Sequence, residues 1–238
     1  MAGPGGAVAP AGVQDATRHR RWSADAWLLA RRGDAGTLST GAVPASYGAS
    51  QAGGVLRYAI APRNAHAPTA YLRASTSLGM SSEIEAAAGI SARPLGRVPV
   101  VLAAELRALR GADGRVHARP AVLAVSQLPP LALPLGTRGE AYLQGGYVGG
   151  AFATPFIDGQ LRVDRELVRI GKAQLRAGLG IWGGAQKGAS RLDVGPGVTL
   201  GLPLSRDVFA RVALDWRLRA AGDAAPGSGP ALTLSAGF

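Results

Sequence analysis

The sequence contains no cysteine, so neither a disulfide framework nor a cysteine-based metal site is available to it. Its three histidines, His19, His66 and His117, are widely separated, which argues against a histidine metal site. No span of about 20 apolar residues could form a transmembrane helix. One long uncharged stretch, 120–137, carries four prolines, which a continuous helix does not tolerate. We therefore expect no metal, no cofactor and no helical membrane anchor.

Aromatic residues are scarce, at 5% of the chain, although hydrophobic residues make up 47%. The apolar content is mostly alanine, leucine and valine, and the 35 glycines exceed the usage of average globular domains. A water-soluble core usually draws on bulky aromatic side chains. This composition instead favours a surface that faces an apolar phase, or a core of closely approaching backbones.

Acidic residues are outnumbered by basic ones, 15 to 26, and the net charge is +11. A basic balance is typical of proteins that meet nucleic acid, an anionic membrane surface or another polyanion. Here the basic residues, nearly all arginine, alternate with apolar residues and form no single patch, and no known nucleic-acid-binding motif is present. We expect no nucleic-acid partner.

The dominant periodicity of the chain is two residues, which indicates β-strands. In "RLDVGPGVTLGL" (191–202), for example, charged residues and glycine alternate with leucine and valine. The pattern predicts about twelve strands separated mostly by short turns: 21–30, 53–61, 69–78, 81–93, 99–109, 115–127, 137–148, 156–164, 174–182, 191–202, 209–220 and 230–238. The segments 21–30 and 115–127 alternate least clearly. The long gap at 32–52 is predicted to be an external loop or a plug of the lumen.

Three features of these strands favour a membrane barrel. Their apolar face consists of small and medium aliphatics, their polar face mixes both charge signs with glycine, and their length suits a tilted crossing of the hydrocarbon. Lipid offers no partners for backbone groups, so such a sheet must close on itself. The aromatics available for an interfacial girdle are few: Trp22, Trp27, Tyr58, Tyr147, Trp216 and Phe238.

The predicted fold class is therefore all-β: a closed antiparallel up-and-down transmembrane β-barrel of about 12 strands. It is expected to form one domain over 21–238, preceded by a disordered leader over 1–20. The alternative is a soluble or periplasmic β-barrel that turns its apolar face inward and binds an apolar ligand.

The polar face of the predicted barrel carries arginines and carboxylates. Pairs between neighbouring strands would stiffen the wall, with or without transport. The excess of arginine predicts a pore that favours anions. The predicted lumen-lining residues are Arg57, Arg73, Glu85, Arg93, Glu105, Arg107, Arg138, Glu140, Asp158, Arg162, Asp164, Arg176, Arg191, Asp193, Arg211, Asp215, Arg217 and Arg219.

Two other patterns have simpler explanations. "GLGIWG" (178–183) matches the dinucleotide-binding fingerprint, but no helix is expected after it, and glycines in a crowded strand explain it better. His117 with Asp113, at the mouth of a predicted hairpin, is the one tempting catalytic combination, and a solvated turn histidine is the commoner case. We expect no catalytic residues and no enzyme.

The chain ends on "ALTLSAGF", with Leu232, Leu234, Ala236 and Phe238 on one face of the last strand. This ending resembles the C-terminal assembly signal of Gram-negative outer-membrane β-barrel proteins, which the barrel-assembly machinery recognises. A second, more distant similarity is to the C-terminal barrel regions of exopolysaccharide-export and phage-adsorption proteins. It is carried by "RWSADAWLLAR", "YGASQAGGVLRY" and "GEAYLQGGYVGG".

These resemblances imply an outer-membrane location. They also imply outer-membrane lipid, the assembly machinery, and an anionic solute or polysaccharide as partners. The predicted function is a pore, or the membrane-anchoring or translocation domain of an export system.

The first 21 residues lack the basic and apolar regions of a secretory signal. Because an outer-membrane barrel must first be exported, we expect that the start is misassigned or that the chain is the tail of a longer product. A protein that is not exported is the remaining alternative.

Overall fold

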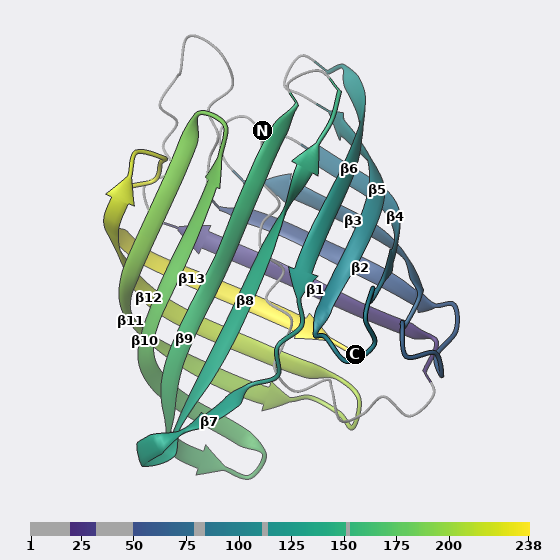
Figure 1. The fold of residues 1–238 in the computed structure, drawn as a ribbon. Coiled ribbons are helices and arrows are strands. Elements are labelled where there is room, and N and C mark those ends of the chain that lie inside the picture. The colour runs from purple at the N-terminus through teal and green to yellow at the C-terminus, as the bar shows by residue number, and fades with distance from the viewer. Residues whose placement is uncertain (1–19, 32–49, 79–83, 111–113, 151–152) are drawn as a thin grey trace.

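The computed structural model describes residues 20–31, 50–78, 84–110, 114–150 and 153–238 (Figure 1). The leader predicted at 1–20 and the long gap predicted at 32–52 lie almost entirely outside this part of the chain. In the described residues, no helix is long and apolar enough to cross a membrane.

Strands account for nearly all of the described structure, as the period of two predicts. They are β1 (Trp22–Arg31), β2 (Gln51–Ala59), β3 (Thr69–Ser77), β4 (Ile84–Ala92), β5 (Val100–Arg110), β6 (Val116–Ser126), β7 (Leu131–Leu133), β8 (Thr137–Val148), β9 (Thr154–Ile170), β10 (Ala173–Gln186), β11 (Ala189–Pro203), β12 (Phe209–Gly222) and β13 (Gly229–Gly237).

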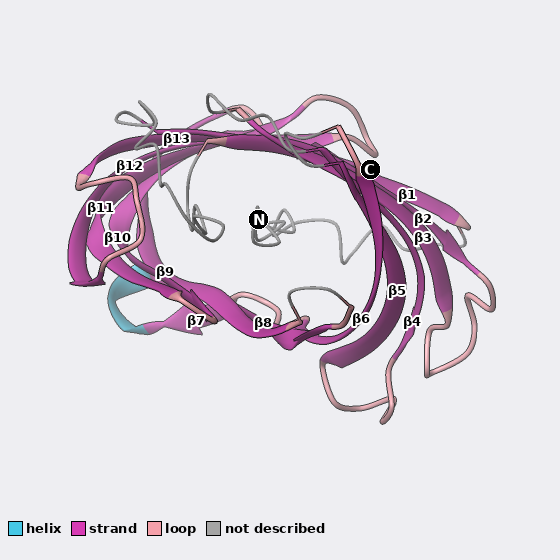
Figure 2. Ribbon diagram, turned by 90° about the horizontal axis from the view of Figure 1, so that it is seen from above, coloured by secondary structure: helices cyan, strands magenta, loops and turns pink. Residues whose placement is uncertain are grey.

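The strands form one antiparallel sheet that closes into a barrel, and the predicted fold class is confirmed in this respect. Consecutive strands pair as hairpins, and β1 pairs with β13 from Asp25↔Gly237 to Arg31↔Ala231. The ring is completed where β6 pairs with β8, since the three-residue β7 pairs only with β8. Twelve strands therefore make the wall, and Figure 2 shows them enclosing an elongated cross-section.

Two parts of the wall differ from the predicted strands. The strands β9 to β12 have 17, 14, 15 and 14 residues and extend beyond their predicted bounds. The sequence did not predict the extension of β9, because apolar and polar residues do not alternate in "RELVRI" (165–170). The pairing of this segment with β10 contains a register shift between Leu175 and Arg176 of β10. The short β7 and a 3-10 turn, Pro134–Gly136, fill the proline-rich stretch between β6 and β8.

The two open ends of the barrel are built from different segments. The end that we call terminal contains the start of β1 and the end of β13, where Ala24 and Phe238 exchange backbone hydrogen bonds of 3.0 and 3.2 Å. The end that we call distal contains the β10–β11 turn and the β12–β13 loop, among others. The last strand therefore pairs with the first strand up to Phe238.

Along most strands of the wall, buried polar residues alternate with exposed apolar ones. On β12, Arg211, Asp215 and Arg217 are buried, whereas Leu214 and Trp216 are exposed. Because the sheet is closed, the buried positions face the lumen and the exposed positions form the outer wall. This is the reverse of a soluble barrel, in which apolar side chains fill the interior.

The sparse aromatics divide between the two faces. Trp22 and Tyr58 lie on the outer wall at the terminal end, with ring centroids 4.9 Å apart. Trp27, which the girdle interpretation placed at the interface, is buried on the inner face of β1. Its indole packs over Gly53 of β2, where a Cβ atom would come within 2.4 Å of the ring. The glycine on β2 thus leaves the space on the inner face that this indole occupies.

Candidate functional site

The inner face of the barrel is the candidate functional site. The structure places every residue of the predicted lumen set except Arg93 at an inward strand position. Arg93 follows the last residue of β4, just before Pro94 turns the chain out of the sheet. Its guanidinium instead donates to the side-chain oxygen of Gln127 at the terminal rim, at 2.8 and 3.2 Å.

Further charged residues that the predicted set lacks also face the lumen, among them Asp25 and Arg31 on β1, and Arg119 on β6. These are the two strands with the poorest alternation. In β1 the inner face also carries Trp27 and Leu29, so apolar residues stand on both faces and the two-residue contrast is lost. The inward face of β1 could have been predicted from the neighbouring strand, because Arg57 on the inner face of β2 forms an ion pair with Asp25.

One charged cluster lies on β3, β4 and β5. Arg73 binds Glu85 at 2.7 Å and Glu105 at 3.1 Å, so one guanidinium joins two carboxylates. The hydroxyl of Tyr71 donates to the other oxygen of Glu105 at 2.8 Å. Arg107 also pairs with Glu105 from within the same strand. Three adjacent strands are thereby cross-linked from the inside.

A second cluster spans β8 to β12. Glu140 of β8 lies 2.7 Å from Arg138 on its own strand and 2.8 Å from Arg211 on β12. Asp215 of β12 pairs with Arg162 of β9, and Arg162 also donates to Thr199 of β11 at 3.3 Å. These contacts skip intervening strands, so they run across the concave interior rather than along the wall.

Trp182 of β10 forms an aromatic platform within the second cluster. The guanidinium carbons of Arg217 and Arg162 lie 4.5 and 5.2 Å from its ring centroid, within cation–π range. The ring itself packs against Gly180, two residues earlier on the same inward face, where a Cβ would meet it at 2.4 Å. The glycines of "GLGIWG" (178–183) thus accommodate side chains in a strand, and no helix follows them.

The histidines do not assemble a catalytic centre in the described part of the chain. His117 is exposed near the start of β6, and its proposed partner Asp113 lies outside the described residues. His66 lies at the opposite, terminal end, where a ring nitrogen is 2.8 Å from the carbonyl oxygen of Arg93. No cluster of three or more potential metal ligands occurs among the residues that the structure describes.

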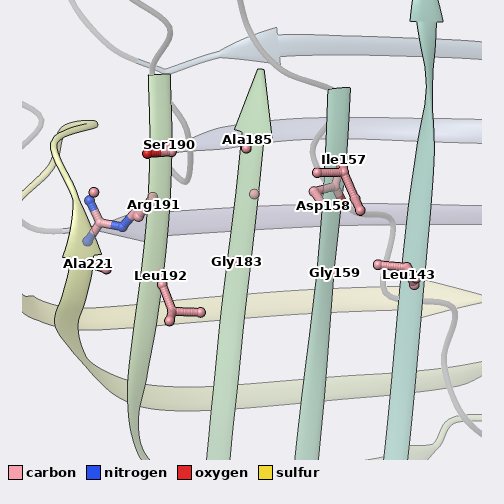
Figure 3. Close-up of a pocket in the computed structure, with 12 residues that line it drawn as sticks. Leu143, Ile157, Asp158, Gly159, Gly183, Ala185, Ser190, Arg191, Leu192 and Ala221 are labelled. Atoms are coloured by element: carbon pink, nitrogen blue, oxygen red, sulfur yellow. The ribbon is translucent and has the colours of Figure 1, made fainter. Parts of the chain in front are cut away.

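A separate hollow of about 430 Å³ lies over β8 to β12 near the distal end (Figure 3). Outward-facing residues supply most of its lining, with Leu143 and Ile157 on one side and Leu192 on the other. Gly159 and Gly183 form its floor, which leaves the outer wall thin. Most of its lining is therefore aliphatic or glycine.

Comparison with known proteins gives no family. No family model matches the chain, and no curated protein matches it. Several solved structures, among them the following three, show a limited likeness to it. The β domain of the Bordetella autotransporter BrkA is 12% identical, with a TM-score of 0.44, and the match covers 92% of this chain and 99% of that one.

The other two structures are LpxR from Salmonella typhimurium and OmpT, an outer membrane protein of Vibrio cholerae in its trimer form. LpxR is 11% identical with a TM-score of 0.42, over 91% of this chain and 99% of that one. OmpT is 6% identical with a TM-score of 0.30, over 91% and 98%. Similarity at this level assigns the chain to no family, so its function must be argued from its own geometry.

Proposed function

We propose that this chain is an outer-membrane β-barrel that acts as a pore, or as the membrane-anchoring domain of an export system. The observation that carries the proposal is the inverted polarity of the wall. Large apolar side chains are exposed around the outside, among them Leu72, Ile90 and Leu179 at 60%, 63% and 68% exposure. The inside carries buried arginines and carboxylates.

Water is a poor solvent for this outer wall, because soluble monomers rarely expose contiguous apolar patches of more than a few hundred Å². A lipid bilayer suits it, since a closed sheet pairs its backbone groups between neighbouring strands and has no open edge in hydrocarbon. The alternative, a soluble barrel with an apolar ligand inside, is disfavoured because the interior is ionic. Outer-membrane lipid is the partner that the wall fits.

The lumen supports an anion preference. Arginines outnumber carboxylates on its surface, and rings of one charge sign select ions of the other sign. Several inward polar atoms, including Nη2 of Arg107, Nη2 of Arg211 and Oδ1 of Asp215, make no hydrogen bond with the residues that the structure describes. Such groups suit an interior that holds water and small ions. We propose anionic solutes or polysaccharides as the cargo.

Membrane location is tested by fractionation and gel migration. The folded barrel should sediment with the outer membrane and should migrate differently on gels before and after boiling. Recovery of the whole protein in a detergent-free soluble fraction would overturn the proposal.

Pore and anchor are separated by conductance in planar lipid bilayers. A pore should give discrete current steps, with a reversal potential in a salt gradient that indicates anion preference. Folded barrels that leave the current at baseline would refute the pore and leave the anchoring role.

A further inference from the structure

The β12–β13 loop, residues 223–228, lies in the distal mouth of the barrel and is fastened there. The side chain of Pro226 is fully buried, and Ala224 is 6% exposed. The chain turns inward at Gly222, whose φ of +84° favours glycine. A Cβ atom at this position would come within 2.2 Å of the carbonyl oxygen of Ser190. The sequence therefore directs this loop toward the lumen.

Three arginines hold the loop through its backbone carbonyl oxygens. Arg191 donates to Ala224 at 2.7 Å, to Gly227 at 3.2 Å and also to Pro226. Arg219 donates to Pro226 at 2.6 Å, and Arg31 donates to Gly227 at 3.2 Å. The three arginines come from β11, β12 and β1, so the carbonyl oxygens accept from strands on both sides of β13.

Among the described residues, two of these arginines share one carboxylate. The carboxylate of Asp193, 1% exposed, pairs with Arg191 at 2.7 Å and with Arg31 at 2.9 Å. One carboxylate thus pairs with two buried guanidinium groups, and neutral carbonyl oxygens accept hydrogen bonds from all three arginines. Hydrogen bonds from a guanidinium to an anion are roughly twice as strong as neutral ones, so an anionic oxygen would be the better partner for these donors.

We propose that Arg31, Arg191 and Arg219 form a binding site for a phosphate or carboxylate group, and that the β12–β13 loop occupies this site in the absence of the anion. An entering anion takes the arginine donors, and the loop leaves the distal mouth. The inference rests on the proposed function insofar as it needs anionic solutes to reach the lumen. It adds the place where they bind and the segment that they displace.

The loop is suited to leave because few other contacts with the described residues hold it. Besides the arginine contacts, it makes a backbone hydrogen bond from Ala224 to Ser190 at 3.2 Å and one from the Arg219 amide to Ser228 Oγ at 2.9 Å. Only two small side chains, Ala224 and Pro226, are buried. Segments with few buried apolar contacts belong to the least stable parts of a fold and open most readily.

The absence of native cysteine permits a direct test. In the folded barrel, Ala224→Cys places a thiol at a buried loop position, and Ala225→Cys places one at the adjacent exposed position. Maleimide labelling rates are measured in detergent with chloride, inorganic phosphate, glucuronate or glucose at matched ionic strength. We expect phosphate or glucuronate to raise the labelling rate of Ala224→Cys about tenfold or more, and Ala225→Cys to label rapidly throughout.

The outcomes separate cleanly. Acceleration by phosphate alone assigns a phosphate ligand, and acceleration by glucuronate alone assigns a carboxylate. An Ala224→Cys rate that neither anion changes, in barrels whose gel migration shows that they are folded, overturns the proposal. Acceleration by glucose to the same extent also overturns it.

Adding Arg191→Gln to Ala224→Cys tests the role of the arginines. We expect fast labelling without any anion and no further response to phosphate. Arg219→Gln provides a second variant if Arg191→Gln does not fold. Slow labelling in a folded variant would show that these arginines do not hold the loop. Because labelling needs no current, a barrel with phosphate-dependent labelling but no conductance refutes the pore alone.

Discussion

A guanidinium nitrogen of Arg211 on β12 lies 2.8 Å from a carboxylate oxygen of Glu140 on β8, although three strands separate β8 from β12 in the sheet. The contact exists because the wall curves back on itself, so the two side chains meet inside the barrel. Arg138 lies 2.7 Å from the same carboxylate. Glu140 is therefore shared by two arginines, whereas Arg211 has one carboxylate partner among the ion pairs of the described residues.

This sharing predicts unequal effects of two substitutions. Glu140→Gln removes the carboxylate that Arg211 and Arg138 share and leaves Arg138 only the more distant Asp164, at 3.6 Å. It should lower the free energy of unfolding by about 3–5 kcal/mol, as for other broken buried pairs. Arg211→Gln leaves Glu140 paired with Arg138 and should cost less, about 1.5–3 kcal/mol. Urea titrations followed by tryptophan fluorescence measure both values. Equal losses, or a larger loss for Arg211→Gln, would contradict the shared geometry.

The packing of Trp182 predicts that Gly180 does not tolerate alanine. A Cβ at Gly180 would come within 2.4 Å of the indole, whereas the nearest atom to a Cβ at Gly145 is 3.4 Å away. Gly180→Ala should therefore destabilise the barrel by about 1–3 kcal/mol, as overpacking does. Gly145→Ala should be neutral or slightly stabilising, since alanine is favoured over glycine within a strand. The same denaturant titration compares the two variants.

Charge on the outer wall distinguishes a lipid surface from a water surface. Leu179, in the middle of β10, and Leu135, in the turn before β8, are 68% and 85% exposed. Leu179→Arg should lower stability in bilayers by about 2–4 kcal/mol, the cost of arginine near the membrane midplane, and Leu135→Arg should have little effect. If both changes are tolerated equally, the outer wall does not face lipid.

The pair formed by Asp25 and Arg57 predicts opposite changes in ion selectivity. Both residues lie on the inner face near the terminal end, and their carboxylate and guanidinium are in contact. Arg57→Gln should shift the reversal potential in a salt gradient toward less anion preference, and Asp25→Asn should shift it the other way. Shifts of the same sign would show that the charge of this pair does not act on the permeating ion.

The proposed assembly role of the last strand predicts that one substitution affects insertion in cells but not folding into detergent. Phe238 is 40% exposed on the outer wall, and its backbone pairs with Ala24. Phe238→Ala keeps the backbone pairing and removes the ring, so folding into detergent should continue as in the parent chain. Insertion in cells, measured as heat-modifiable protein in the outer membrane, should fall several-fold. Normal insertion in cells would refute a signal carried by the ring.

Sequence pattern was most informative where one face of a strand is purely polar. Around β11 and β12, charged residues and glycine alternate with aliphatics, and the inward set that includes Asp193 and Arg217 follows directly. Prediction failed where the lumen holds apolar groups. Trp27 and Leu29 lie on the inner face of β1, so the two faces of this strand do not differ in polarity. For this reason the predicted lumen set lacked Arg31.

The sequence by itself determined the number of wall strands and, on most of them, which residues face inward. It could do so because the two-residue period of a strand is a local property. The tertiary structure alone decided which charges meet: Arg211 with Glu140, Arg31 with Asp193, and Arg191 with the β12–β13 loop. Those contacts depend on the register of every intervening strand and on the curvature of the closed wall, neither of which is encoded in any one segment.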